Sequence, residues 1–423
     1  MNFIDLFAGA GGLSEGFMRQ GYEPVAHIEM NNYAAQTLRT RAVYYCLKDA
    51  GNLEIYRNYL RKDITRDQLY SSVDPNLLNT IINREISNKN IDDIFRLIDE
   101  GLTNRGITEI DVLIGGPPCQ AYSLVGRARD PYNKQYDPRN FLYKQYVRFL
   151  DEYKPKMFVF ENVPGIRTAG KGKLFEDVKR IMDKAGYDIE AQVLDASDFG
   201  VLQKRKRVIL IGWVKGTNYF YPKFERLELG YKVSDIFEDL PSLIPGETKD
   251  YNYTKKPNSY LKKFGIRQTN DILVQNICRP HNERDRSIYK IAIELWNKGE
   301  IRLKYTDLPE DLRTHKNLTS FLDRFKVVGK NISQSHTVVA HIAKDGHHYI
   351  HPDINQLRSI SVREAARLQS FPDNFFFEGP RTAIFTQIGN AVPPLMAESI
   401  ALKIKKILEA ETNLPRQIEL FSN

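Results

Sequence analysis

Short apolar segments alternate with longer helical patterns along the first half of the chain, from residue 2 to about residue 213. Glycine, proline and charged residues bound the short segments, so they predict strands, and the longer patterns predict crossover helices. Residues 157–160 and 208–211 are apolar throughout, as in strands buried on both faces. We therefore expect a doubly wound, mostly parallel α/β sheet, with strands over residues 3–7, 24–29, 112–114, 156–163, 189–194 and 207–213.

The remaining pattern predicts how the chain is divided. In a polar insertion at about residues 66–108, the spacing of one buried helix face is followed by Ile91, Ile94, Phe95 and Ile98. The regular alternation ends near residue 216, and residues 216–330 are irregular and rich in Lys, Arg, Tyr and Asn. Helical patterns return at residues 361–370 and near the C-terminus. We expect a main domain over 1–215, a smaller second domain over 216–330, and a return segment, 331–423, that completes the main domain.

The net charge and the cysteine content indicate which kind of partner and which cellular compartment to expect. Lys and Arg number 61 against 53 for Asp and Glu, which gives a net charge of +8 and favours a polyanionic partner. Cys46, Cys119 and Cys278 form no Cys-x-x-Cys pair, so we expect neither disulfides nor a cysteine-rich zinc site. Without a basic leader or a run of 18 apolar residues, the sequence predicts a cytoplasmic protein that does not enter membranes.

A glycine-rich turn follows the first expected strand, where residues 7–13 read Phe-Ala-Gly-Ala-Gly-Gly-Leu. Glycines let the backbone turn tightly and bring a helix N-terminus close to a ligand, although such a turn can also be purely structural. Glu29 ends the second expected strand, in the place of the acid that binds ribose hydroxyls in nucleotide sites. By itself Glu29 is equally well explained as a solvated carboxylate. Together the two features favour an adenosine-containing cofactor.

Three further segments carry candidate catalytic groups. Residues 115–123, Gly-Gly-Pro-Pro-Cys-Gln-Ala-Tyr-Ser, follow an apolar strand and present Cys119 as a candidate nucleophile, although a lone cysteine is usually a small buried apolar residue. Glu161 ends another buried strand, where a structural ion pair is the alternative to a catalytic acid. In residues 203–207, Gln-Lys-Arg-Lys-Arg, the alternation of an extended segment directs Arg205 and Arg207 the same way, although most basic runs are solvated.

These segments, with two more near the C-terminus, resemble the motifs of the cytosine-5 DNA methyltransferases of the bacterial or phage modification type. The set comprises residues 5–12, 116–120, 161–163, 203–207, 363–372 (Arg-Glu-Ala-Ala-Arg-Leu-Gln-Ser-Phe-Pro) and 387–394 (Gln-Ile-Gly-Asn-Ala-Val-Pro-Pro). Six motifs in the family's order, from one end of the chain to the other, make the resemblance specific. Leu202 departs from it, because many members have proline before the Gln. The resemblance implies a Rossmann-like class I methyltransferase fold and places target recognition in residues 216–330.

The resemblance also implies a chemical mechanism. Methylation at carbon 5 of cytosine needs a thiolate to add at carbon 6, and this role falls to Cys119. Glu161 assists at ring N3 and Arg207 at the carbonyl oxygen, with Arg205 in support.

S-adenosylmethionine is the implied methyl donor, and no metal is needed. Glu29 is expected at its ribose and Asp63 at its adenine. The full set of implied cofactor contacts is Phe7, Ala8, Gly9, Gly11, Gly12, Glu29, Asp63, Ile64, Pro117, Leu142, Asn390, Ala391 and Val392. The histidines near the second domain show no regular ligand spacing, which argues against a metal site at His341, His347, His348 and His351.

The implied partner is double-stranded DNA with the target cytosine flipped out, since the target atom is inaccessible inside a duplex. We expect a monomer on DNA that belongs to a restriction-modification system and does not contact the cognate endonuclease. Methylation of transfer RNA is the nearest alternative. A nucleotide-dependent thiol enzyme is a less favoured alternative, because it assigns no role to Glu161 and Arg207. An inactive DNA-binding relative is disfavoured, because Cys119, Glu161 and Asn390 are all present.

Overall fold

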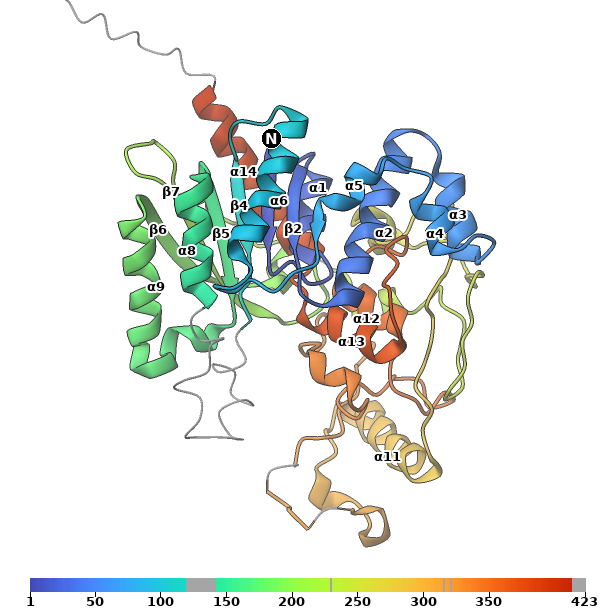
Figure 1. The fold of residues 1–423 in the computed structure, drawn as a ribbon. Helices are drawn as coiled ribbons and strands as arrows, with labels where there is room; N and C mark the ends of the chain where they lie inside the picture. The colour runs from blue at the N-terminus through green and yellow to red at the C-terminus, as the bar shows by residue number, and fades with distance from the viewer. Residues whose placement is uncertain (119–141, 229, 315, 320–321, 413–423) are drawn as a thin grey trace, which may run out of the picture.

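The computed structural model describes residues 1–118, 142–228, 230–314, 316–319 and 322–412. Their strands form one seven-stranded sheet in the order β3-β2-β1-β4-β5-β7-β6, parallel apart from β7, which is antiparallel to both neighbours. The strands are β1 (Asn2–Leu6), β2 (Glu23–Ile28), β3 (Ile81–Ile82), β4 (Val112–Gly115), β5 (Met157–Asn162), β6 (Tyr187–Asp195) and β7 (Lys206–Val214). The strand order reverses between β1 and β4, and ligands of such sheets bind in the crevice at that point. The expected sheet is thus confirmed (Figure 1).

Both faces of the sheet are buried, because successive side chains of a strand point to opposite sides. In β5, Met157 and Val159 join one core, and Phe158 and Phe160 join the other. The first core includes α1 (Gly12–Arg19), α12 (Val362–Leu368), α13 (Arg381–Asn390) and α14 (Pro394–Thr412). The second includes α6 (Ile91–Arg105), α8 (Leu142–Tyr153) and α9 (Lys173–Lys184).

Part of the expected insertion at residues 66–108 belongs to the sheet itself. β3 pairs with β2 at one edge, and α6 crosses from β3 to β4. Ile91, Ile94 and Ile98 are buried, as their spacing predicted. A strand of two residues leaves no readable apolar pattern, which explains why the sequence did not reveal it. Before it, in blue in Figure 1, come α2 (Asn32–Asp49), α3 (Leu53–Arg61), α4 (Arg66–Tyr70) and α5 (Pro75–Asn79).

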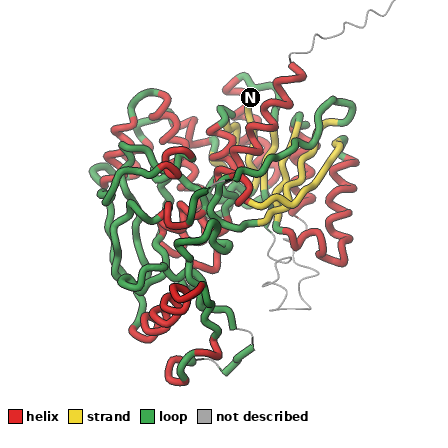
Figure 2. Tube along the Cα trace, turned by 180° about the vertical axis from the view of Figure 1, so that it is seen from behind, coloured by secondary structure: helices red, strands yellow, loops and turns green. Residues whose placement is uncertain are grey.

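Residues 216–330 do not share one core. Tyr221 and Tyr260 pack into the main core beside α12 and α14. A smaller core begins at α11 (Glu283–Gly299) and extends past residue 330 to Ile350. This part of the molecule is mostly loop in Figure 2. The other short helices are α10 (Ser259–Lys263) and the 3-10 turns η3 (Pro164–Gly172), η4 (Ala196–Phe199), η5 (Val233–Ile236), η6 (Tyr305–Asp307), η7 (Glu310–Leu312) and η8 (Ala340–Ala343).

Helix length and composition bear on membrane insertion. Among the residues that the structure describes, no helix is both long and apolar enough to cross a bilayer.

Candidate active site

The turn between β1 and α1 is packed against other backbone on one side, at Gly12, and is uncovered on the other, at Gly9. Phe7, Gly9 and Gly11 have positive φ angles of 56°, 56° and 81°, which only glycine adopts without strain. A Cβ atom at Gly12 would lie 2.2 Å from the carbonyl oxygen of Val392, so the turn packs directly on the return segment. A Cβ atom at Gly9 would meet nothing within 4 Å. The backbone at Gly9 is therefore accessible to a ligand.

The end of β2 is hydrogen-bonded to this turn. The Ala8 amide donates to the Ile28 carbonyl at 3.1 Å, and the Gly9 amide donates to Glu29 Oε2 at 2.8 Å. Glu29 Oε1 accepts from the Asn31 amide at 2.6 Å. Burial raises the pKa of Glu29, and these hydrogen bonds oppose the rise. Each carboxylate oxygen accepts more than one hydrogen bond, so Glu29 retains capacity for hydroxyl donors.

The structure places Asp63 and Ile64 in the link between α3 and α4, not at the end of a strand. Asp63 is exposed, and Ile64 packs against the apolar cluster of α2 and α3. In open α/β sheets, ligands bind in the crevice outside the carboxyl ends of the strands. The position of Asp63 therefore does not suit the adenine contact that the resemblance implied. The cause is the set of helices α3 to α5, which separates Asp63 from the strand next to β2.

Asn83, directly after β3, occupies the strand end beside Glu29. Its side-chain nitrogen donates to the carbonyl oxygens of Glu29, at 2.8 Å, and Met30, at 3.1 Å. Because both contacts use the amide nitrogen, the amide oxygen is left to accept another hydrogen bond. Asn83 was not among the residues expected at the cofactor. The only sequence signal for its position is the pair Ile81-Ile82 before it, which is too short to identify as a strand.

The structure brings the C-terminal motif to the glycine turn. α13 ends at Asn390, which is exposed, and Ala391 and Val392 are buried. A Cβ atom at Gly389 would lie 2.3 Å from the backbone nitrogen of Ala340 in η8, so this helix end packs tightly against another loop. The first and last of the six motifs, at opposite ends of the chain, therefore lie in contact. Leu142 is half-buried at the start of α8.

Glu161 and Arg207 form an ion pair where β5 and β7 lie side by side. Arg207 Nε lies 2.7 Å from Glu161 Oε1, and both side chains are mostly buried. A Cβ atom at Gly116 would lie 2.5 Å from Glu161 Oε2, so this glycine allows the loop after β4 to approach the carboxylate. The next residue, Asn162, donates from its side chain to the Pro117 carbonyl at 3.2 Å. The start of the loop at residues 116–118 is thus held against Glu161. Cys119 lies outside the described residues.

Arg205 points to a different set of groups. Its Nη1 and Nη2 donate to the carbonyl oxygens of Val338, at 2.6 Å, and Gly389, at 3.1 Å. Full burial, and next the charge of Arg207, lower its pKa well below the ordinary value. Arg205 therefore joins β7 to two segments of the C-terminal region, whereas Arg207 contacts the acid.

The histidines that we did not expect to bind a metal have partners within the protein. Tyr289 hydroxyl lies 2.9 Å from His347 Nδ1, and His341 Nε2 lies 3.3 Å from Asp345. Burial lowers the pKa of His351 to about 4. Within the described ranges, no three His, Cys, Asp or Glu side chains are arranged to hold a metal ion.

Sequence comparison matches nearly the whole chain to one family. Residues 1–65 and 69–406 match the model of the C-5 cytosine-specific DNA methylases. The type II methyltransferase M.Bpa9945I of Bacillus paralicheniformis is 45% identical, over 96% of this chain and 99% of that protein. M.XorII of Xanthomonas oryzae pv. oryzae is 33% identical, over 98% of this chain and 87% of that protein.

Structural comparison agrees on the fold. A prophage-encoded protein of E. coli, described as a DNA modification methyltransferase, superposes with a TM-score of 0.62 at 24% identity, covering 97% of this chain and 99% of that chain. The methyltransferase EhMeth of Entamoeba histolytica gives a TM-score of 0.54 at 15% identity, covering 96% and 98%. The sheet is that of class I S-adenosylmethionine-dependent methyltransferases. From the family match and these relatives, we conclude that the chain belongs to the C-5 cytosine-specific DNA methylase family and is a DNA methyltransferase.

Proposed function

We propose that this enzyme transfers a methyl group from S-adenosylmethionine to carbon 5 of a flipped-out cytosine in a specific double-stranded DNA sequence, through a covalent adduct with Cys119. The observation that carries the proposal is the Glu161–Arg207 ion pair, held beside the start of the loop that leads to Cys119. An acid and a cation at this position suit a ring that gains negative charge during addition.

The residues around the glycine turn fit the proposed cofactor. Gly9 leaves open backbone where α1 begins, and Glu29 presents a carboxylate beside it, suited to ribose hydroxyls. Asn83, rather than Asp63, offers an amide oxygen that can accept from the exocyclic amine of adenine. Asn390, Ala391 and Val392 bound the other side of the turn. When bound there, S-adenosylmethionine supplies an electrophilic methyl group.

Three side chains divide the work on the cytosine ring. The Cys119 thiolate adds at carbon 6, which makes carbon 5 nucleophilic. Glu161, once protonated, donates to ring N3, and Arg207 binds the carbonyl oxygen, so that both limit the negative charge of the adduct. After methyl transfer, water takes the proton from carbon 5, the C5–C6 double bond forms again, and the C6–S bond breaks to release the thiolate. Arg205 supports Arg207 indirectly, because its hydrogen bonds to the Val338 and Gly389 carbonyls fix the backbone at the start of β7.

The proposed biological role follows from the relatives. They include type II methyltransferases, which are named for the modification half of restriction-modification systems. We propose that this enzyme acts as a monomer on DNA and protects the sequence cut by a cognate endonuclease without contacting that endonuclease.

The proposed adduct can be trapped on DNA that carries 5-fluorocytosine at the target position. The target is first located by sequencing methylated cytosines in DNA from an expressing host. Fluorine cannot leave carbon 5 as a cation, so the last elimination fails and the methylated ring stays bonded to the enzyme. With S-adenosylmethionine present, we expect peptide mapping to find the adduct on Cys119. Cys119→Ser should form none, because a hydroxyl is far less ionised than a thiol near neutral pH.

Two other thiols provide internal controls, since Cys46 is exposed and Cys278 is buried. An adduct on either of them, or no adduct in an active preparation, would overturn the assignment of Cys119. Methylation of transfer RNA but not of DNA by the same preparation would replace the proposed substrate.

A further inference from the structure

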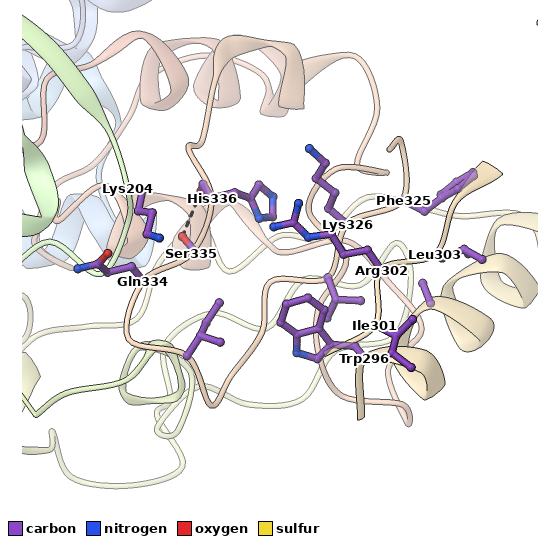
Figure 3. A pocket seen from close by; sticks show the side chains of 13 residues that line it. Lys204, Trp296, Ile301, Arg302, Leu303, Phe325, Lys326, Gln334, Ser335 and His336 are labelled. Carbon is purple, nitrogen blue, oxygen red and sulfur yellow. Dashed lines mark hydrogen bonds between the residues drawn. The ribbon is translucent and has the colours of Figure 1, made fainter. Parts of the chain in front are cut away.

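A pocket of about 120 Å³ lies between the segment that precedes β7 and the core around α11. Lys204 and Gln334 line it from the side of the sheet, and Arg302, Lys326 and Trp296 line it from the side of α11 (Figure 3). Its position relative to the catalytic groups is fixed by the chain, because Lys204 precedes Arg207 by three residues.

Hydrogen bonds hold the wall on the side of the sheet together. The Lys204 amide donates to the Ser335 carbonyl at 2.9 Å, and Thr337 Oγ1 donates to the Lys204 carbonyl at 2.6 Å. On the far wall, a Cβ atom at Gly329 would lie 2.5 Å from the Trp296 ring, so the indole is pressed against backbone. The backbone on both sides of the pocket is therefore held by packing and hydrogen bonds.

The charge of the pocket is positive and incompletely compensated. It contains Lys204, Arg302 and Lys326, and the nearby acid is Asp323. Asp323 Oδ2 lies 2.6 Å from Lys326 Nζ and 3.9 Å from Arg302 Nη1, and all these groups are partly exposed. Such exposed ion pairs are weak, so a better anion can replace the aspartate. In the part of the chain that the structure describes, Lys204 has no acidic partner within ion-pair distance.

These features suit one chemical class of ligand. A phosphodiester is a compact anion with several acceptor oxygens, which suits lysine and arginine donors that line one pocket from separate walls. If DNA is the substrate, as proposed above, the backbone of the strand near the target base passes the start of β7. A phosphate held between the sheet and the α11 core would then fix the distance between catalysis and recognition.

We propose that Lys204, Arg302 and Lys326 together bind one backbone phosphate of the substrate DNA, and that this phosphate bridges the catalytic part and the α11 part of the enzyme. The inference rests on the proposed function.

The test uses a duplex that contains the target sequence and a single methylphosphonate, which removes the charge of one phosphate at a time. For the wild-type enzyme we expect one position near the target at which affinity falls about tenfold, as for loss of one charge-assisted contact. Lys204→Gln and Arg302→Gln should each weaken binding to unmodified DNA and reduce the slope of log Kd against log salt by about 1. At that one position, the methylphosphonate should cost these variants little more.

Two further variants sharpen the result. Asp323→Asn removes the competing carboxylate, so it should tighten binding to unmodified DNA. Lys406→Gln, an equal change of charge on the exposed surface of α14, should leave both affinity and salt slope as in the wild-type enzyme. Thermal unfolding of each variant shows that the fold is kept.

Two results would overturn the phosphate site. One is that the affinity losses from the methylphosphonate and from Lys204→Gln or Arg302→Gln add at every phosphate position. The other is that Asp323→Asn leaves DNA binding unchanged and Lys204→Gln leaves the salt slope unchanged. If the wild-type enzyme still methylates cytosine in the same duplex, only this inference fails. If the wild-type enzyme methylates no cytosine in DNA, the proposed function fails first.

Discussion

The ion pair of Glu161 with Arg207 makes one substitution especially informative. Glu161→Gln keeps the shape of the side chain and its place beside Gly116, but the amide cannot deliver a proton. We expect methyl transfer to slow by roughly 10² or more, the usual contribution of general acid catalysis, while the fold and the cofactor affinity are kept. Single-turnover rates and calorimetric cofactor binding measure the two effects separately. A wild-type rate in this variant would remove Glu161 from the chemistry.

The two arginines show what residue order can and cannot predict. Alternation on an extended segment predicted that Arg205 and Arg207 point the same way, but it could not identify their partners. Both side chains are buried in the structure. Arg207 contacts Glu161, because β7 pairs with β5, whereas Arg205 contacts carbonyl groups from residues 338 and 389. Partners so distant in sequence depend on tertiary packing. The same reason explains why the sequence did not indicate that Asn83, rather than Asp63, lies at the strand end beside Glu29.

At the scale of elements, the packing of α1 against the return segment predicts a clear contrast between two glycines. In Gly12→Ala, the new Cβ would meet the Val392 carbonyl, so backbone must shift. We expect a loss of about 1–3 kcal/mol in the free energy of unfolding, as for other overpacked sites, and weaker binding of S-adenosylmethionine. Urea unfolding and calorimetry measure the two effects.

Gly101→Ala is the matched control, because Gly101 lies within α6 and a Cβ there meets nothing within 4 Å. Replacing a helical glycine in open space should stabilise the protein by roughly 0.5–1 kcal/mol and leave cofactor binding unchanged. Equal stability of the two variants would contradict the close packing of Gly12 on Val392.

The strands illustrate which elements the sequence could predict. β5 and β7 were predictable because a strand buried on both faces is apolar at every position. β3 was not predictable, because two residues are too few to show a period of hydrophobic positions, and its place depends on pairing with β2. The antiparallel direction of β7 also leaves no trace in the apolar pattern, since burial is the same for either direction.

At the scale of the whole molecule, the core around α11 sets where recognition can be exchanged. This core joins Phe325 and Val327 to Ile350, so a boundary at residue 330, where composition changes, cuts through it. We expect that exchanging residues 283–357 for those of a relative changes the DNA sequence that is methylated but not the atom modified. Bisulfite sequencing of host DNA reads both.

The matched chimera exchanges residues 216–330 instead. Because it separates Ile350 from its partners and replaces residues of the main core, it should unfold at lower temperature than the first chimera. An unchanged target sequence in an active 283–357 chimera would place recognition elsewhere in the chain.

The contact between α1 and α14 has a consequence for how the enzyme comes into being on the ribosome. Arg19 pairs with Glu398 at 3.1 Å, and a Cβ at Gly16 would lie 2.3 Å from the Glu398 backbone nitrogen. During synthesis, α1 therefore lacks this packing surface until α14, some 379 residues later along the chain, has been made. We expect a nascent or truncated chain that stops before α14 to leave DNA unmethylated. Methylation after induction should accordingly begin only after α14 has been translated.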